Sequence, residues 1–108
     1  MPRRPHLTYP TVLVLNAIAA GYQYGFDIMD VTGLASGTVY PALRRLERLG
    51  MLRSRWENEQ QALDEQRPPR RYYEITRPGR AVLGEGLARF PGIERTLPVQ
   101  VPSRTVNP

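Results

Sequence analysis

The sequence has no cysteine, no lysine and a single histidine among its 108 residues. Without cysteine, disulfides and thiolate metal sites are excluded. The one histidine, His6, lies in an N-terminus rich in proline and arginine, so no Ser/His/Asp or Cys/His set can be assembled. Asp27 and Asp30 have no histidine to share a metal with, and "GEG" at 84–86 is not a phosphate-loop pattern. We therefore expect neither an enzyme nor any cofactor.

Long apolar runs are also missing. No stretch approaches the roughly 20 apolar residues that a membrane-spanning helix needs. The apolar stretch 11–20 follows arginines and superficially resembles a signal peptide, but Asn16 interrupts it and no cleavage-type segment follows. We expect a soluble, cytoplasmic protein with no membrane partner.

The charge is strongly one-sided. The net charge is +5, and all 15 basic residues are arginine. A basic chain suggests a polyanionic partner, and the planar arginine fork suits phosphate and guanine. The alternative is that arginine replaces lysine through codon bias, so composition alone does not decide for nucleic acid.

The length fits one small domain, whose own core is modest and would gain from association with a second copy. We expect residues 1–8 to be a flexible arm and residues 9–90 to form the domain. The proline-punctuated residues 91–108 are expected to be an extended or disordered tail.

Three helices are predicted in the first half of the chain, over 9–21, 24–33 and 36–50. Thr8 and Ser36 are candidate N-caps, and Gly33 is a candidate stop. The first helix has little polar face, which predicts burial. The second offers Phe26, Ile28, Met29 and Val31 to the core. Two short helices joined through Gly33 form a helix-turn-helix.

Alternating residues predict strands over 51–57 and 70–76, joined by a long mobile tip that shows no periodicity. We expect Trp56, Tyr72 and Tyr73 to pack the hairpin on the helices rather than to stack on a ligand. A last helix is predicted over 77–90, capped by Thr76. The expected fold is mainly α with a small β-hairpin, a winged helix-turn-helix.

The third helix has two contrasting sides. A core stripe consists of Val39, Ala42, Leu43, Leu46 and Leu49, whereas three arginines lie on the opposite side. The free N–H groups of its first turn favour a phosphate, and its N-terminal half would enter a major groove. The candidate DNA contacts of this helix are Ser36, Gly37, Thr38, Tyr40, Pro41, Arg44, Arg45 and Arg48. The alternative is an ordinary solvated face whose arginines pair with Glu47 and other carboxylates.

The segments "YGFDI" (24–28), "SGTVYPAL" (36–43), "RLE" (45–47) and "RYY" (71–73), with Thr76 and Gly79, resemble the PadR family of winged helix-turn-helix regulators. The resemblance covers about residues 10–90 and implies double-stranded DNA as partner, repression, and a homodimer made by a C-terminal helical part. This chain has only one helix there, so it resembles a short form. The wing tip carries Glu57, Glu59, Asp64 and Glu65, which would repel phosphate. Arg67, Arg70 and Arg71 are therefore the expected wing contacts.

Two apolar stripes are left for a dimer interface, one at the start of the first helix and one on the last helix. We expect the interface at Val12, Leu13, Leu83, Leu87 and Phe90. Two alternatives stay open: a winged helix that binds protein, which the acidic wing favours, and a ligand-sensing repressor with an apolar effector pocket.

Overall fold

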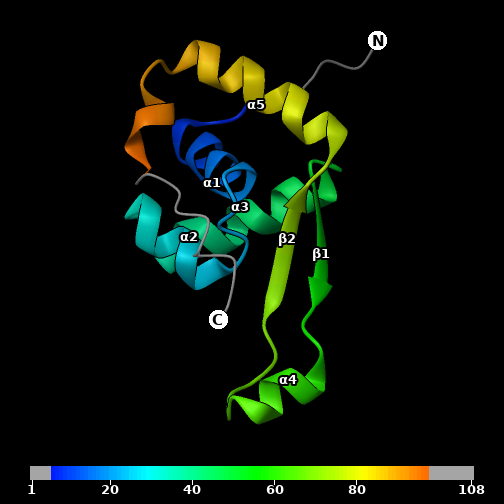
Figure 1. The fold of residues 1–108 in the computed structure, drawn as a ribbon. Coiled ribbons are helices and arrows are strands. Elements are labelled where there is room, and N and C mark those ends of the chain that lie inside the picture. The colour runs from blue at the N-terminus through cyan, green and yellow to red at the C-terminus, as the bar shows by residue number, and fades with distance from the viewer. Residues whose placement is uncertain (1–5, 98–108) are drawn as a thin grey trace.

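A computed structural model describes residues 6–97, and its elements follow one another around a central helix (Figure 1). In chain order they are α1 (Tyr9–Ala19), α2 (Gly25–Thr32), α3 (Ser36–Arg48), β1 (Leu52–Trp56), α4 (Glu59–Asp64), β2 (Arg71–Ile75), α5 (Arg77–Arg89) and the short 3₁₀ helix η1 (Ile93–Thr96). The expected fold class, mainly α with one antiparallel hairpin, is confirmed.

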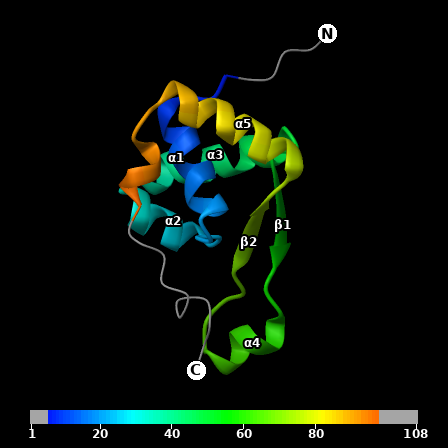
Figure 2. The same ribbon diagram turned by 45° about the horizontal axis from the view of Figure 1, so that its top comes forward.

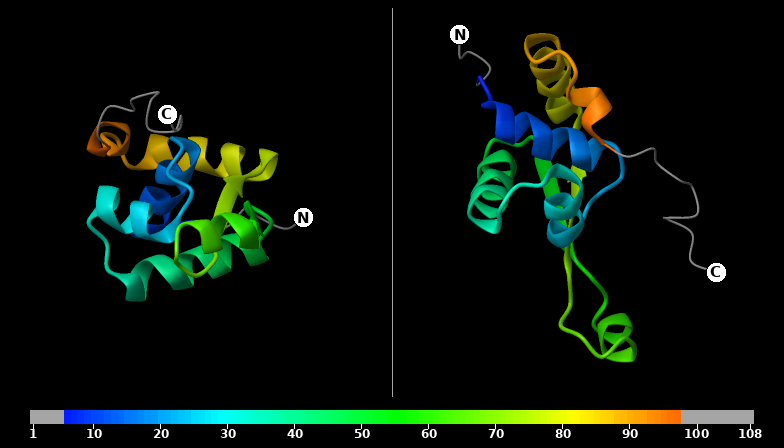
Figure 3. Two further views of the ribbon diagram at one scale, coloured as in Figure 1. Left: turned by 60° about the horizontal axis from the view of Figure 1, so that its bottom comes forward. Right: turned by 90° about the vertical axis from the view of Figure 1, so that its left-hand side faces the viewer.

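The central helix is α1, with α5 on one side of it and α2 and α3 on the other (Figure 3). Its start is fixed by Thr8, whose hydroxyl oxygen accepts a hydrogen bond from the Thr11 amide at 3.4 Å. Residues 11–18 are all buried, as the missing polar face predicts. The helix ends at Ala19, two residues before the predicted end, and the chain turns at Gly21 with a φ of 107°.

The turn between α2 and α3 lies where the sequence predicts it. Gly33 adopts a left-handed conformation (φ 74°), and its amide donates to the Met29 carbonyl at 2.9 Å. Ala35 is extended and is the residue before the first turn of α3. Ser36 is thus the first helical residue and not the N-cap, and no side chain caps this helix.

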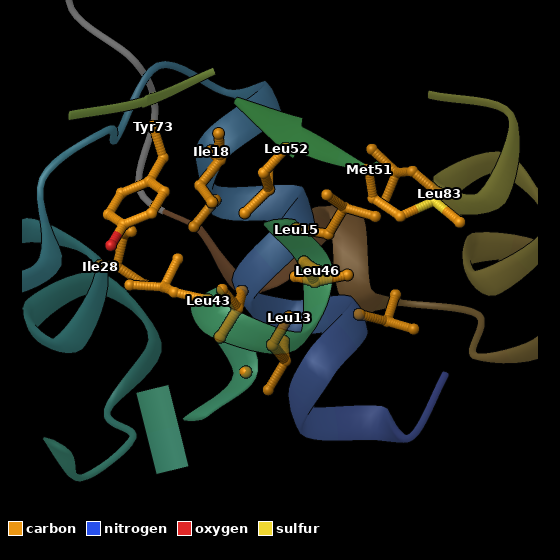
Figure 4. Packing of buried hydrophobic residues seen from close by; sticks show 14 of the residues in the cluster. Leu13, Leu15, Ile18, Ile28, Leu43, Leu46, Met51, Leu52, Tyr73 and Leu83 are labelled. Carbon is orange, nitrogen blue, oxygen red and sulfur yellow. The ribbon is translucent and has the colours of Figure 1, made fainter. Parts of the chain in front are cut away.

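One continuous core joins the three N-terminal helices, the base of the hairpin and α5 (Figure 4). Its largest fully buried side chains include Leu15 of α1, Ile28 of α2, and Leu43 and Leu46 of α3. The leucine stripe of α3 therefore docks on the first two helices as predicted.

Three large apolar side chains that were expected to be buried are exposed. Phe26 is 62% exposed in the first turn of α2, where its ring meets only the edge of Tyr24 among the described aromatic residues. Leu49 lies just past the end of α3, and Trp56 is 63% exposed because the outer end of β1 extends beyond the helices. Trp56 shares the face of Leu52 as predicted but lies beyond the limit of the core, whereas Phe26 lies away from the buried residues Gly25 and Ile28 of α2.

The hairpin pairs Leu52 with Ile75, Ser54 with Tyr73, and Trp56 with Arg71. Leu52 and Tyr73 are buried at its base, and the outer end projects away from the helical body (Figure 2). The tip is not the irregular mobile segment that was predicted, because it forms the short helix α4. Asn58 caps α4 by accepting a hydrogen bond from the Gln60 amide at 2.7 Å.

The packed unit is wider than the predicted range 9–90. Leu7 is buried, and its carbonyl accepts a hydrogen bond from Arg89. At the other end, η1 buries Ile93 beside α1, so residues 91–97 are not an extended tail. The remainder of the predicted arm and tail, residues 1–5 and 98–108, lies outside the described residues.

Candidate nucleic-acid interface

The helix α3 has one buried side and one exposed side. Val39, Leu43 and Leu46 have no exposed surface, and Ala42 is buried beside them. The exposed residues are Ser36, Gly37, Thr38, Tyr40, Pro41, Arg44 and Arg48, and Arg45 is half-buried. All eight predicted contacts of α3 thus lie outside the core, and the arginines form a cationic surface along one helix.

The first turn of α3 has backbone N–H groups that are not used in intrahelical hydrogen bonds. No side chain caps it, and the first intrahelical bonds are those from the Thr38 and Val39 amides to the Ala35 carbonyl, at 2.9 and 3.0 Å. The amides of Ser36 and Gly37 precede these donors at the exposed start of the helix, where the helix dipole favours an anion. Pro41 lies inside α3 without ending it.

The ring of Tyr40 lies against the start of α2. A Cβ atom on Gly25 would come within 2.6 Å of the Tyr40 hydroxyl oxygen, so any larger residue there would require the ring to shift. The Tyr40 side chain therefore packs against the start of α2 while part of it remains exposed to solvent.

The three wing arginines that were predicted to contact phosphate are all held by other residues of the chain. Arg67 pairs with Glu57, with Nη1–Oε1 at 2.5 Å and Nη2–Oε2 at 2.7 Å. The Arg70 guanidinium stacks 4.4 Å from the centre of the Tyr24 ring. Arg71 bonds to Ser54 and approaches Glu47.

Of the four acidic residues that were expected to make the wing tip repel phosphate, one is neutralised within the chain. Glu57 is buried and neutralised by Arg67, which holds its pKa at about 2 mainly through their hydrogen bonds. Glu59, Asp64 and Glu65 stay exposed on and after α4, and Glu65 lies 3.0 Å from Arg67.

Arg55 is a further exposed arginine of the hairpin. It is exposed on β1, with its guanidinium 5.2 Å from the centre of the Tyr72 ring. It was not among the contacts predicted from the sequence. The pattern that could have identified Arg55 is the alternation along β1, which buries Leu52 and directs the neighbouring arginines outward.

The apolar surface that was expected for a partner chain is narrower than predicted. Val12, Leu13 and Leu83 are buried in the core of the single chain, so they offer no free surface. For Val12 and Leu83, the cause is the close packing of α5 on α1. Leu87 and Phe90 remain half-buried at the edge of this packing.

The structure also bears on metals, membranes and effectors. Within residues 6–97, no group of three metal-ligating side chains comes together, and no helix has the length and apolarity to cross a membrane.

Two open hollows of about 240 and 250 Å³ lie at the wing tip and beside β2. Both are small for an effector, because drug-sized sites occupy about 300–1,000 Å³.

Comparison with known proteins identifies the family. The model of the transcriptional regulator PadR-like family matches residues 14–85, from α1 into α5. The chain belongs to this family. Members of the PadR-like family are transcription regulators and not enzymes, and they bind DNA.

Solved structures agree with this assignment. A PadR family transcription regulator from Clostridium difficile R20291 is 26% identical, with a TM-score of 0.67 over 82% of this chain and 93% of its own. A PadR family regulator from Eggerthella lenta DSM 2243 is 30% identical, with a TM-score of 0.57 over 73% of this chain and 71% of its own. No curated protein matches the chain. The PadR-like winged helix is thus the scaffold that carries the arginines of α3.

Proposed function

We propose that this PadR-like chain represses transcription as a homodimer, with α3 of each copy in the major groove of one half-site. The observation that carries the proposal is the division of α3. Leu43 and Leu46 bury one side completely, while Arg44 and Arg48 leave the other side cationic. A helix with this division can insert its N-terminal half into a groove without exposing core.

The contacts are assigned by position on α3. Ser36, Gly37 and Thr38 lie at the exposed N-terminus, which suits a phosphate or a base edge. Arg44 lies about two turns further along α3. It is the residue proposed to contact guanine, because an arginine fork bonds its O6 and N7 together. Arg48, near the C-terminal end, is proposed to contact the phosphate backbone.

The proposed dimer interface consists of apolar side chains that stay partly exposed where α1 and α5 pack together. Phe90 meets the edge of Tyr9 with ring centres 5.4 Å apart, and Leu87 lies one turn before Phe90 on α5. Tyr9 is 46% exposed, so these three side chains form a partly open apolar patch. A second copy that covers the patch would give the dimer two α3 helices, one for each half-site.

A protein partner is the second candidate. The exposed side chain of Leu63 on α4 lies among the carboxylates of the tip, a surface that suits a basic protein better than DNA. The salt dependence of DNA binding separates the two candidates.

The test is a binding measurement on selected DNA. The full chain selects duplexes from a random library, and fluorescence anisotropy follows binding to the selected and a scrambled duplex between about 50 and 200 mM salt. We expect tight binding to the selected duplex that weakens with salt, and loss of that preference in Arg44→Ala. Arg80→Ala removes the same charge from the exposed surface of α5 and serves as control. Equal, weak binding to both duplexes by the unaltered chain would refute sequence-specific binding.

Repression is tested separately in cells. A reporter promoter that overlaps the selected site should be silenced when the chain is expressed, and Arg44→Ala should relieve the silencing. Activation of the reporter would contradict the proposed sign of regulation.

A further inference from the structure

A three-residue network ties α3 to the wing. The Ser54 hydroxyl on β1 donates to Glu47 Oε2 on α3 at 2.5 Å. Arg71 on β2 donates to Ser54 Oγ from Nε at 3.0 Å and from Nη2 at 2.8 Å, and its Nη2 lies 3.4 Å from Glu47 Oε1. The two strands and the helix therefore share one set of polar contacts.

The strand register explains why these residues meet. Residues 52, 54 and 56 of β1 share a face of the hairpin with residues 71, 73 and 75 of β2. This face is apolar at the base, where Leu52 and Tyr73 enter the core. Further out it passes over the edge of α3 and becomes polar at Ser54 and Arg71. The Trp56 ring then supports the Arg71 guanidinium, with 5.3 Å between the guanidinium carbon and the ring centre.

Glu47 is the residue that needs an explanation. It lies on the helix that is proposed to enter a groove lined by phosphates, where a free carboxylate would repel DNA. Its side chain is 34% exposed, and both of its oxygens face Ser54 or Arg71. The carboxylate is thus directed at the wing and not at the solvent in front of α3.

We propose that Glu47, Ser54 and Arg71 are positioning residues that fix the angle between α3 and the wing, and that Arg71 does not act as a phosphate contact. The network would make α3 and the hairpin one rigid reading unit, so that α3 and the wing engage the duplex in a fixed register. The DNA part of this proposal rests on the proposed function, whereas the rigidity of the wing does not.

Glu47→Ala distinguishes the two roles of Arg71. If Arg71 contacts phosphate, removing a carboxylate from the DNA side and freeing Arg71 should strengthen binding. If the network positions the wing, the same change should weaken binding to the selected duplex at least about threefold, a size typical of coupled contacting residues. Alanine keeps α3 helical, since it is the strongest helix former. Unchanged or tighter binding would overturn the proposal.

Ser54→Ala and Arg71→Gln extend the test. Ser54→Ala changes no charge, yet it should weaken binding as Glu47→Ala does. Arg71→Gln should leave the salt slope unchanged, whereas loss of a phosphate contact lowers it by about 0.9. The combination of Glu47→Ala with Arg71→Gln should bind no more weakly than either change alone, because both break the same tie. A lowered slope together with additive losses would show that Arg71 contacts phosphate.

Arg53→Gln is the matched control. Arg53 adjoins Ser54 on β1 but lies on the other face, with its Nη2 3.7 Å from Glu74 Oε1. The Arg53→Gln change removes one arginine charge from the hairpin without altering the network of Glu47, Ser54 and Arg71. It should therefore leave the angle between α3 and the wing unchanged.

The rigidity of the wing can be measured without DNA. Because the chain has no cysteine, Leu63→Cys on α4 and Ala88→Cys on α5 place two spin labels at unique exposed sites. Labelled chains are diluted with unlabelled chains, and the distance distribution is recorded by electron spin resonance. We expect Glu47→Ala and Ser54→Ala to broaden or shift the distribution and Arg53→Gln to leave it unchanged. Identical distributions in all variants would overturn the proposal even if the chain binds DNA. A chain that binds no DNA but shows the broadening would refute only the proposed function.

Discussion

Arg67 and Glu57 form a bidentate ion pair at the base of the wing tip, in which the two terminal guanidinium nitrogens lie 2.5 and 2.7 Å from the two carboxylate oxygens. The strands are extended by one further backbone bond there, from the Glu57 amide to the Arg70 carbonyl at 2.7 Å. The Arg70 amide in turn donates to Glu57 Oε1 at 3.1 Å. The ends of the tip segment are therefore joined by side chain and backbone together, and α4 lies between them.

The ion pair makes the tip sensitive to acid. The hydrogen bonds from Arg67 lower the pKa of Glu57 from 4.5 to about 2, although burial opposes this shift. A carboxylate with a lowered pKa stabilises the fold fully above its unfolded pKa, and this stabilisation is lost as the pH falls from 4.5 toward 2. Carbon-detected NMR of the Glu57 carboxyl should show a titration midpoint near 2, and the α4 resonances should change with it.

Arg67→Gln provides the control for this titration. Without the guanidinium, the pKa of Glu57 should rise toward or above its ordinary value, because burial alone raises it. A midpoint near 2 in the variant as well would show that Arg67 is not the cause.

Arg44→Ala tests the assignment of α3 to base recognition. The change should cost about 1–3 kcal/mol of binding free energy and relax the preference at one base position. The measurement is anisotropy on a panel of duplexes that differ from the selected one by single base pairs. The same loss on every duplex would make Arg44 a phosphate contact.

Leu46→Ala tests the buried side of α3. Leu46 has no exposed surface, so its truncation should cost about 2–5 kcal/mol of the free energy of unfolding. Leu63→Ala, at a side chain that is 68% exposed, is the control and should change the stability little. Denaturant unfolding measures both, and equal effects would mean that α3 is oriented differently.

Leu87→Glu tests the proposed dimer. A carboxylate in an apolar interface would be desolvated without a partner, so the change should dissociate the dimer and weaken binding to the two-half-site duplex. Ala81→Glu adds the same charge on the exposed face of α5 and should have no such effect. Light scattering and circular dichroism would follow assembly and folding. A folded Leu87→Glu variant that remains dimeric would place the interface elsewhere.

Much of the fold follows from local pattern. The apolar stripe of α3, the stop at Gly33 and the alternation of β1 are all short-range signals, and each of them placed its element correctly. The division of α3 into buried leucines and outward arginines was equally predictable, since a helical wheel needs only the residue order.

The parts that the sequence could not give depend on contacts between distant residues. Nothing near Glu57 indicates that Arg67 will bury it, so its carboxylate was expected to face phosphate. Glu47 was considered only as a surface partner for the arginines of its own helix, because its contact with Ser54 and Arg71 depends on how the hairpin crosses α3. In the same way, Val12 was expected to contact a partner chain, because the sequence does not indicate that α5 of the same chain packs on it.

The burial of Ile93 by η1 has a practical consequence for anyone who trims this protein. The family match stops at residue 85, and sequence periodicity stops at Phe90, so either position would be a natural place to cut a shorter fragment. Such a fragment would lack the Ile93 side chain and the contact of η1 with α1, and it would expose apolar surface there. Proteases should therefore digest it faster than the intact chain, and a crystallographer or spectroscopist is better served by a boundary beyond residue 97.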